Sequence, residues 1–371
     1  MKIAILTWNY PPKQTGGTEI ATQNLAGALS RKGHEIMVVT TRDAGLPEKS
    51  TREGFRVHRV RSLRPKLLKY AFFCFSALKL LRRFNPDIIH AQAMWMGLPA
   101  FICKLVIKRP YIFWARGLDV YSPRLFKGPL SKLVLRNAAA VIALTENLKK
   151  KMQEMYNRDI FVIGNGVDIE KFGTWSKEAA RAELNIKESE QVVIFVGSLI
   201  PVKGVQYLVE AMNTVIQHFP EARLLLVGDG EEREYLEKLA DKLNLAEHIT
   251  FIGRVANQRV PEYLVASDLF VLPSLSEGFP NVILEAMAAG LPIVTTNVSG
   301  LSEIVKDGEN GFVVETRNPQ QLAEKISLLL SDTELRNRFS VNNRSEAEQN
   351  SWEAVVEKLE KVYLNTTTVH S

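Results

Sequence analysis

The sequence contains few of the residues that build disulfide frameworks and metal sites. Only two cysteines occur among its 371 residues, Cys74 and Cys103, and both lie in apolar surroundings. Isolated cysteines of this kind are typical of buried thiols in a reducing compartment. His, Cys and carboxylate residues do not cluster at metal-ligand spacing, so we expect no bound metal.

Long hydrophobic runs and targeting signals are also missing. The longest apolar region, residues 71–81, is interrupted by Lys79 and is too short to cross a bilayer. The first residues, Met1–Leu6, form a short strand-like run that is unlike a secretory signal peptide. We therefore expect a soluble, cytoplasmic protein. Low-complexity tracts and repeats of solenoid period are absent from the sequence.

Charge and motifs argue against nucleic acid and nicotinamide partners. The net charge of +6 permits attraction to anionic partners, but the basic residues are dispersed and no nucleic-acid-binding motif occurs. The run Val227–Gly230 begins like a dinucleotide fingerprint, yet Arg233 stands where the third glycine belongs. We therefore expect neither nucleic acid binding nor a cofactor.

Short apolar runs alternate with helical patterns along the whole chain, which predicts an α/β fold with parallel sheets covered on both faces. A chain of 371 residues is too long for one ordinary core and suits two doubly wound, Rossmann-like domains. The predicted strands are Lys2–Thr7, Ile36–Thr41, Phe55–Val60, Asp87–Ala91, Tyr111–Trp114, Ala140–Leu144, Ile160–Ile163, Val192–Val196, Arg223–Val227, Ile249–Phe251, Leu269–Leu272, Ile293–Thr295 and Gly311–Val313.

The boundary between the two domains is expected in the stretch Asp168–Glu190, which is rich in Lys and Glu and has no buried-strand pattern. This gives one domain over 1–168 and a second over 169–350, followed by a final helix over 351–371. A cleft between two doubly wound domains is a natural ligand site.

Two glutamates eight positions apart, Glu277 and Glu285, lie in a segment that reads as strand, loop and then a helix from near Pro280 to before Gly290. A helix N-terminus binds phosphate, so the loop glutamate could meet a sugar and the helix glutamate could accept hydrogen bonds from ribose. The alternative is that Glu277 complements the helix dipole and Glu285 is a solvated helix residue. The run closely resembles the Glu-x7-Glu element of the retaining glycosyltransferases of family 4, which have the two-domain GT-B fold.

The resemblance extends over essentially the whole chain and implies a donor site for a nucleotide diphosphate sugar. Gly16 and Gly17 match the family's glycine loop, where Gly17 or Thr18 can cap the following helix. Lys203 matches the lysine that binds the diphosphate. Ser198 stands where the family usually has an arginine. The remaining donor-binding residues that the resemblance implies are Arg254, Val255, Gly278, Phe279, Asn281 and Val282.

The segment around Arg116 departs from the family pattern. Many relatives have a histidine at this position, three residues before the aspartate that is Asp119 here. A guanidinium stays protonated and cannot be a general base, but it can neutralise a departing diphosphate. Arg116 could therefore compensate for Ser198, or it could pair with Asp119 as an ordinary loop arginine. Gln92 replaces a second family histidine, which favours a structural role for His90.

We predict from this resemblance a retaining, metal-independent, hexosyltransferase-like glycosyltransferase of polysaccharide or glycolipid biosynthesis. Glu277 would orient the donor sugar, Lys203 and Arg116 would stabilise the leaving diphosphate, and a hydroxyl acceptor would enter from the first domain. The final helix would pack back on that domain. The alternatives are a sugar-nucleotide epimerase and a catalytically inert nucleotide-sugar-binding protein.

Basic residues bracket an aromatic and aliphatic helix within Arg61–Arg83. An ordinary core helix with solvated ends explains this pattern, and so does a basic and aromatic rim that rests on the inner face of the cell membrane. The second interpretation implies a lipid-linked saccharide or a membrane glycolipid as the acceptor.

Overall fold

The computed structural model describes residues 1–12, 16–61, 66–117, 120, 128–154, 156–298 and 300–368. The chain divides into two compact units, one formed by Met1–Gly166 with Trp352–Ser371 and the other by Val167–Ser351. The first unit ends two residues before the expected boundary at 168. The chain returns from the second unit to the first between Ser351 and Trp352.

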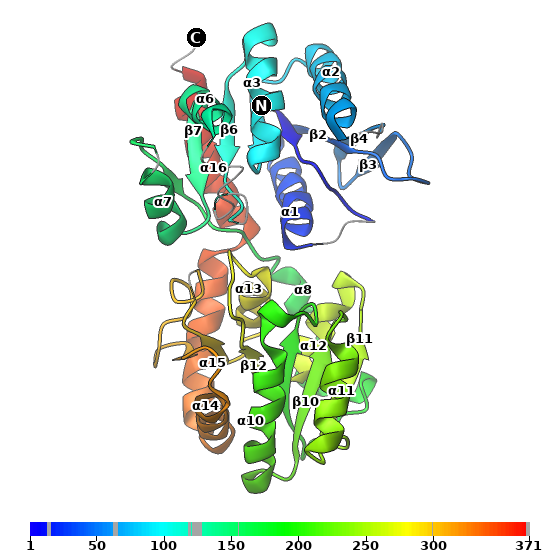
Figure 1. The fold of residues 1–371 in the computed structure, drawn as a ribbon, viewed down its shortest axis with the longest axis vertical. Helices are drawn as coiled ribbons and strands as arrows, with labels where there is room; N and C mark the ends of the chain where they lie inside the picture. Colours follow the sequence, from blue (N-terminus) through cyan, green and yellow to red (C-terminus); the bar gives the residue numbers. More distant parts are fainter. Residues whose placement is uncertain are drawn as a thin grey trace. The chain divides into compact units, whose positions relative to one another are not determined.

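The described residues of the first unit form an eight-stranded sheet with the order β3-β4-β2-β1-β5-β6-β7-β8 (Figure 1). Neighbouring strands pair parallel, except that β3 and β4 are antiparallel. The inner strands read as continuous apolar runs because helices cover both of their faces. The strands are β1 Lys2–Leu6, β2 Glu35–Thr41, β3 Lys49–Arg52, β4 Phe55–Val60, β5 Ile88–Gln92, β6 Tyr111–Trp114, β7 Ala140–Ala143 and β8 Phe161–Val162.

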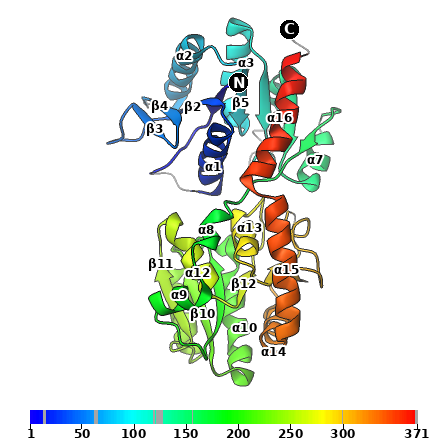
Figure 2. The same cartoon turned by 180° about the vertical axis from the view of Figure 1, so that it is seen from behind.

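Helices α2, α3 and α6 pack side by side on one face of this sheet, and α1 and α16 lie on the other (Figures 1 and 2). Right-handed crossovers place α1, between β1 and β2, on the face opposite α2, between β4 and β5. The helices are α1 Gly17–Arg31, α2 Lys66–Phe84, α3 Met94–Ile107, α6 Pro129–Asn137, α7 Glu146–Gln153 and α16 Trp352–Thr368.

The C-terminal helix α16 packs on the first unit, as the sequence predicted. Three exposed or half-buried contacts join it to α1 and to the turn that follows: Arg31–Glu353 at 3.0 Å, Lys32–Glu357 at 3.0 Å and His34–Glu360 at 2.8 Å. Exposed pairs of this kind contribute little individually. The apolar side of the helix is fully covered, so burial of its hydrophobic side chains is the main stabilisation.

The described residues of the second unit form a six-stranded, wholly parallel sheet with the order β11-β10-β9-β12-β13-β14. The strands are β9 Gln191–Val196, β10 Ala222–Val227, β11 Ile249–Gly253, β12 Leu269–Leu272, β13 Ile293–Thr296 and β14 Gly311–Val314. Its helices are α8 Glu170–Gly173, α9 Lys177–Glu183, α10 Val205–His218, α11 Arg233–Lys242, α12 Val260–Ala266, α13 Asn281–Ala288, α14 Pro319–Ser331 and α15 Thr333–Gln349, with 3-10 turns at Pro201–Lys203 and Asn257–Arg259.

Helices α10 and α11 cover one face of the second sheet, while α12 and α13 cover the other (Figures 1 and 2). The order of the strands explains this, because the chain moves outward from β9 to β11 in one direction and from β12 to β14 in the opposite direction. One hydrophobic core runs through both layers of this unit.

All thirteen predicted strands are confirmed within one or two residues at each end. One strand of the first sheet was not predicted, namely β3, a polar strand at the sheet edge. The stretch Asp168–Glu190, where the boundary was expected, contains α8 and α9 and belongs to the second unit.

Candidate functional site

The loops that follow β9, β12 and β13 meet at the carboxyl edge of the second sheet, where parallel strands all end. Gly204 has a φ of +62°, and a Cβ at this position would lie 2.4 Å from the carbonyl oxygen of Pro273. Gly300 has a φ of +92°, and its Cβ would lie 2.5 Å from the carbonyl oxygen of Gly278. These two glycines allow the loops to pack closely enough to share one site.

Glu277 is at the centre of this group of loops. Its Oε1 accepts a bond from Lys203 Nζ at 2.5 Å and one from Ser274 Oγ at 2.6 Å. The side chains of Lys203 and Glu277 are only 20% and 10% exposed. Thr296 Oγ1 donates to the carbonyl oxygen of Ser274 at 2.5 Å, which ties β13 to the same loop. The two residues that the sequence placed near the reacting sugar and the diphosphate are therefore in direct contact.

Helix α13 begins directly after this loop. Its N-cap residue is Pro280, which provides no side-chain hydrogen bond to the first turn. The first N–H groups of the helix and its positive dipole end therefore remain directed at the carboxyl edge. Gly278 and Asn281 lie at this end of the helix, whereas Phe279 and Val282 pack against the core of the second unit.

Glu285 lies within α13 and is partly buried. Burial raises its pKa to about 7, and the positive charge of Lys171 on α8 only partly opposes this increase. No described residue donates a hydrogen bond to its carboxylate or forms an ion pair with it. A carboxylate in this state is a good acceptor for ligand hydroxyl groups.

The other expected donor-site residues of the second unit also follow strand ends. Ser198 is exposed in the loop after β9, and Arg254 is exposed directly after β11. Val255 packs against the hydrophobic core. Their positions do not reveal a ligand contact, so their roles in donor binding stay predictions.

In the first unit, Gly16 and Gly17 lie at the start of α1, in the turn after β1. The expectation that Thr18 or Gly17 caps this helix is wrong, because the N-cap residue is Gly16. Its backbone is extended, with a φ of −71° and a ψ of 170°, and no side chain caps the first turn. The positive dipole end of α1 therefore lies in the turn after β1, as that of α13 lies after β12.

Arg116 is buried, with 7% of its surface exposed. Its Nε donates to Gln92 Oε1 at 2.5 Å and its Nη1 to Asn165 Oδ1 at 2.6 Å. The guanidinium also lies 4.2 Å from the ring centroid of Trp114. These contacts give Arg116 a structural role in the first unit. Asp119, the aspartate with which it was expected to pair, lies outside the described residues.

His90 is a buried structural residue. Its Nδ1 lies 2.9 Å from the hydroxyl of Tyr363 on α16, and its ring stacks on Trp114 with the centroids 5.3 Å apart. Burial lowers its pKa well below the usual value, and the charge of Arg116 lowers it further. The imidazole is therefore neutral at physiological pH and helps to fix α16 to the sheet.

Sequence reasoning missed an aromatic group at the carboxyl edge of the first sheet. Trp8 follows β1, and its ring centroid lies 5.8 Å from that of Tyr70 on α2. Tyr70 in turn lies 6.3 Å from Trp95 on α3, and Lys69 Nζ lies 5.0 Å from the Trp8 ring. The signal was present, since Trp8 and Trp95 each follow a predicted strand by a few residues. Ser274 and Thr296, the polar support for Glu277, were also missed.

The described part of the chain contains no group of three or more His, Cys, Asp or Glu residues that could hold a metal ion. In the same part of the chain, no helix is long and apolar enough to cross a membrane.

Comparison with known proteins gives matches over both units. Residues 15–171 match the family Glycosyltransferase Family 4, and residues 176–346 match Glycosyl transferases group 1. An uncharacterized glycosyltransferase of Methanocaldococcus jannaschii is 31% identical over 98% of both chains. The structure is similar to that of sucrose-phosphate synthase from Thermosynechococcus elongatus, with a TM-score of 0.86 and 24% identity over 99% of both chains. It is also similar to Anabaena HepE in complex with UDP, with a TM-score of 0.81 and 23% identity over 98% of this chain and 100% of HepE.

Proposed function

Because the chain belongs to the group 1 and family 4 glycosyltransferases, which have the GT-B fold, we propose that it transfers a sugar from a nucleotide diphosphate sugar to a hydroxyl acceptor with retention of configuration. The observation that carries this proposal is the arrangement at the carboxyl edge of the second sheet. The Lys203–Glu277 pair lies beside the uncapped start of α13, and Glu285 lies further along that helix. An anion site, a carboxylate for the sugar and a carboxylate for ribose would thus be combined on adjacent loops and on the helix that follows them.

The proposed role of Lys203 and the start of α13 is to stabilise the negative charge that develops on the leaving diphosphate. Lys203 is partly buried, so its charge is less screened by water than that of a surface lysine. The backbone N–H groups at the start of α13 supply further donors without a reorganisation cost. This charge stabilisation requires no metal ion in the proposed mechanism. Ser198 could contribute a hydroxyl where relatives have an arginine.

The proposed roles of the two glutamates differ. Glu285 would accept hydrogen bonds from ribose, for which its unpaired, partly buried carboxylate is suited. Glu277 would orient the donor sugar and stabilise positive charge at the anomeric carbon. It is already fixed by Ser274 and Lys203, so little orientational entropy would remain to be lost on binding.

For the acceptor, we propose a saccharide or glycolipid that is carried by a lipid. Trp8, Tyr70 and Trp95 offer aromatic surfaces at the carboxyl edge of the first sheet, and Lys69 adds a positive charge beside them. Aromatic faces of this kind bind sugar rings and apolar chains. Trp95 is 51% exposed and is therefore accessible to a ligand.

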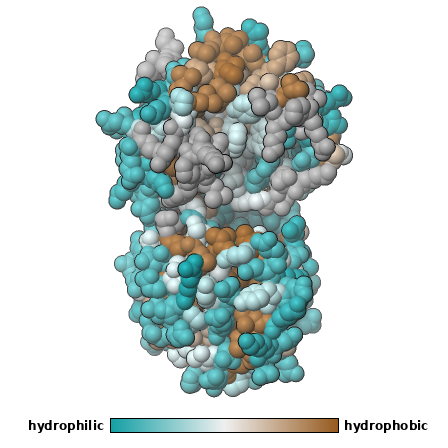
Figure 3. Space-filling view, viewed as in Figure 1, coloured by the Kyte–Doolittle hydropathy of each residue, from teal (hydrophilic) through white to brown (hydrophobic). Residues whose placement is uncertain are grey.

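A contiguous apolar surface supports a membrane-bound acceptor. Figure 3 shows apolar side chains gathered over α3. The large apolar residues exposed on α2, α3 and α6 are Leu68, Phe75, Trp95, Leu105, Val106, Leu130 and Leu133. Exposed basic residues on α2 and α6 accompany them, namely Lys79, Arg82, Arg83, Lys132 and Arg136. Apolar and basic side chains together favour peripheral binding to an anionic bilayer. The proposed place of action is the cytoplasmic face of the cell membrane.

The experiment that tests the proposed function begins with donor binding. Thermal shifts are measured with uridine, guanosine and adenosine diphosphate sugars, since a ligand of the native state raises the melting temperature. Uridine is the first choice of base, because HepE was solved with UDP. The selected donor is then incubated with and without lipid-linked acceptors, and the anomeric configuration of the product is determined. A new sugar nucleotide formed without acceptor would indicate an epimerase, and inversion of configuration would refute the retaining mechanism.

A further inference from the structure

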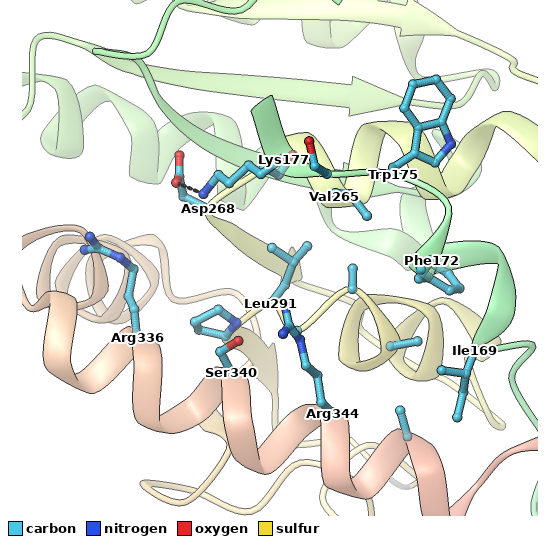
Figure 4. A pocket seen from close by; sticks show the side chains of 18 of the residues that line it. Ile169, Phe172, Trp175, Lys177, Val265, Asp268, Leu291, Arg336, Ser340 and Arg344 are labelled. Atoms are coloured by element: carbon cyan, nitrogen blue, oxygen red, sulfur yellow. Dashed lines mark hydrogen bonds and ion pairs between the residues drawn. The ribbon is translucent and has the colours of Figure 1, made fainter. Parts of the chain in front are cut away.

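A cavity of about 510 Å³ lies in the second unit at the amino edge of its sheet (Figure 4). Asp268 and Pro292, which line it, directly precede β12 and β13. The candidate donor site lies at the carboxyl edge of the same sheet, where those strands end. The cavity is therefore separate from the donor site, and neither Lys203, Glu277 nor Glu285 lines it.

One wall of the cavity is a row of polar side chains on α15. Arg336, Ser340 and Arg344 are four residues apart and share one face of the helix, and Figure 4 shows them directed to the cavity. Arg344 makes no hydrogen bond or ion pair with a described residue. Arg336 is fixed by the carbonyl oxygens of Leu329 and Leu330, at 2.5 and 2.8 Å, which carry no formal charge. The charges of both arginines are thus available to a ligand.

Across the cavity, Lys177 donates to Asp268 Oδ1 at 2.6 Å. Asp268 Oδ2 also accepts bonds from Arg181 at 2.7 Å and from the backbone N–H of Val192 at 2.6 Å. One carboxylate is therefore shared by two cations, and it cannot neutralise the arginines on α15 as well. The remaining carboxylate in the lining is Glu348, which is exposed. The cavity consequently has an excess of positive charge.

The rest of the lining combines polar residues with apolar walls. Phe172, Leu291 and Val265 contribute aromatic and aliphatic walls, and the C-terminal end of α13 forms a further side. Small-molecule sites in proteins have volumes of about 300–1,000 Å³ and combine apolar walls with a few polar groups. Arginine binds phosphate more specifically than lysine does, because its planar donors match two phosphate oxygens.

We infer that this cavity binds a small organic phosphate. The phosphate group would accept hydrogen bonds from Arg336, Ser340 and Arg344, and the organic part would lie against Phe172 and Leu291. A sugar phosphate and a nucleotide share this chemistry. The end of α13, at Ala288 and Ala289, contacts such a ligand, and Glu285 lies one turn earlier on the same helix. The inference is independent of the proposed function, because it uses none of the donor-site residues.

The test measures binding of glucose 1-phosphate, uridine monophosphate and inorganic phosphate to the full chain by calorimetry and thermal shift. Glucose and uridine serve as uncharged controls. Ser340→Asp places a negative charge between the two arginines and removes no cation, while Arg344→Ala removes one donor. Arg338→Ala is the matched control, because Arg338 lies on α15 but does not line the cavity.

We expect at least one organic phosphate to bind more tightly than inorganic phosphate. Ser340→Asp should abolish this binding, Arg344→Ala should weaken it about tenfold or more through loss of a charge-assisted hydrogen bond, and Arg338→Ala should leave it unchanged. Uridine monophosphate that still binds Ser340→Asp but not Glu285→Ala occupies the donor site instead. The inference is overturned if no organic phosphate binds, if binding survives Ser340→Asp, or if Arg338→Ala weakens it as much as Arg344→Ala does. Near-ultraviolet circular dichroism of each variant verifies its fold.

Discussion

The raised pKa of Glu285 predicts that donor affinity depends on pH. Its value of about 7 means that the side chain is mostly ionised at pH 8 and mostly protonated at pH 6. The ionised form is a pure acceptor with a negative charge, whereas the protonated form is uncharged and carries an O–H donor on one oxygen, so it binds the ribose hydroxyl groups less well. If the donor binds the ionised form alone, its dissociation constant should increase about tenfold between pH 8 and pH 6.

The assay is calorimetric titration of an intact nucleotide diphosphate sugar at pH 6, 7 and 8. The sugar is required because its diphosphate is a diester and does not itself titrate in this range. Glu285→Gln retains the shape of the side chain and cannot ionise, so its affinity should be lower at pH 8 and independent of pH. Glu234→Gln is the control, because Glu234 is an exposed glutamate on α11 with a side chain that is 80% exposed. An equal dependence on pH in wild type and Glu285→Gln would refute the assignment.

The same residue predicts a second, independent effect on stability. The pKa of Glu285 is higher in the folded protein than the usual 4.5, so its contribution to stability is lost as pH rises from about 4.5 through 7. Full ionisation would cost at most roughly 3 kcal/mol, and less where water reaches the side chain. Glu285→Gln should therefore have the wild-type melting temperature near pH 4.5 and a higher one at pH 8, by about 2–4 °C for each kcal/mol. A variant that is less stable than wild type at pH 8 would contradict this reasoning.

Three further predictions concern the reaction and its location. Glu277→Ala should lower kcat with little change in donor affinity, by roughly 1.5–3 kcal/mol of transition-state stabilisation, and unchanged kcat would exclude it from the reacting centre. Lys203→Ala should lower kcat by about a hundredfold. If Arg116 also acts on the diphosphate, the loss of kcat in the Lys203→Ala, Arg116→Ala double variant should be smaller than the product of the two single losses. If the two losses multiply, Arg116 has only a structural role. Replacement of Phe75, Trp95 and Leu105 by Ser should reduce sedimentation of the protein with anionic vesicles. Each Lys or Arg near the bilayer surface contributes about 1 kcal/mol to the binding free energy. If the wild-type protein does not bind these vesicles at low salt, the membrane proposal is refuted.

The sequence predicted the strands well because both sheets are mostly parallel and covered on both faces. Such strands are continuous apolar runs, which can be recognised from the local sequence alone. The strand β3, with the sequence Lys49–Arg52, contains no apolar residue and pairs only at the sheet edge, so no local pattern could identify it. Helices α8 and α9 were missed for a related reason, since they are short and mostly exposed.

The sequence named residues of the candidate site, but it could not give the contacts between them. Lys203 and Glu277 were both assigned to the donor site, but their ion pair joins residues that are 74 positions apart. The bond between His90 and Tyr363 spans 273 positions. Side-chain contacts between residues so far apart in the sequence depend on the order of the strands in the sheet and on the conformation of each loop. The spacing of residues within one motif determines neither of these. The motif analysis could therefore name Glu277 but could not predict the support it receives from Ser274.

Two partly buried carboxylates of the second unit, Asp268 and Glu285, differ in their hydrogen-bond partners. This difference favours a structural role for Asp268 and a ligand-binding role for Glu285. Asp268 accepts bonds from two cations and a backbone N–H, so its charge is satisfied within the fold. Glu285 is partly buried without any such partner, and burial raises its pKa, so its ionisation at neutral and higher pH opposes folding. A protein that can surround one carboxylate so completely has no structural need to leave another unpaired. An unpaired, partly desolvated carboxylate at the end of a parallel sheet is better explained by a ligand that completes its hydrogen bonds than by stability.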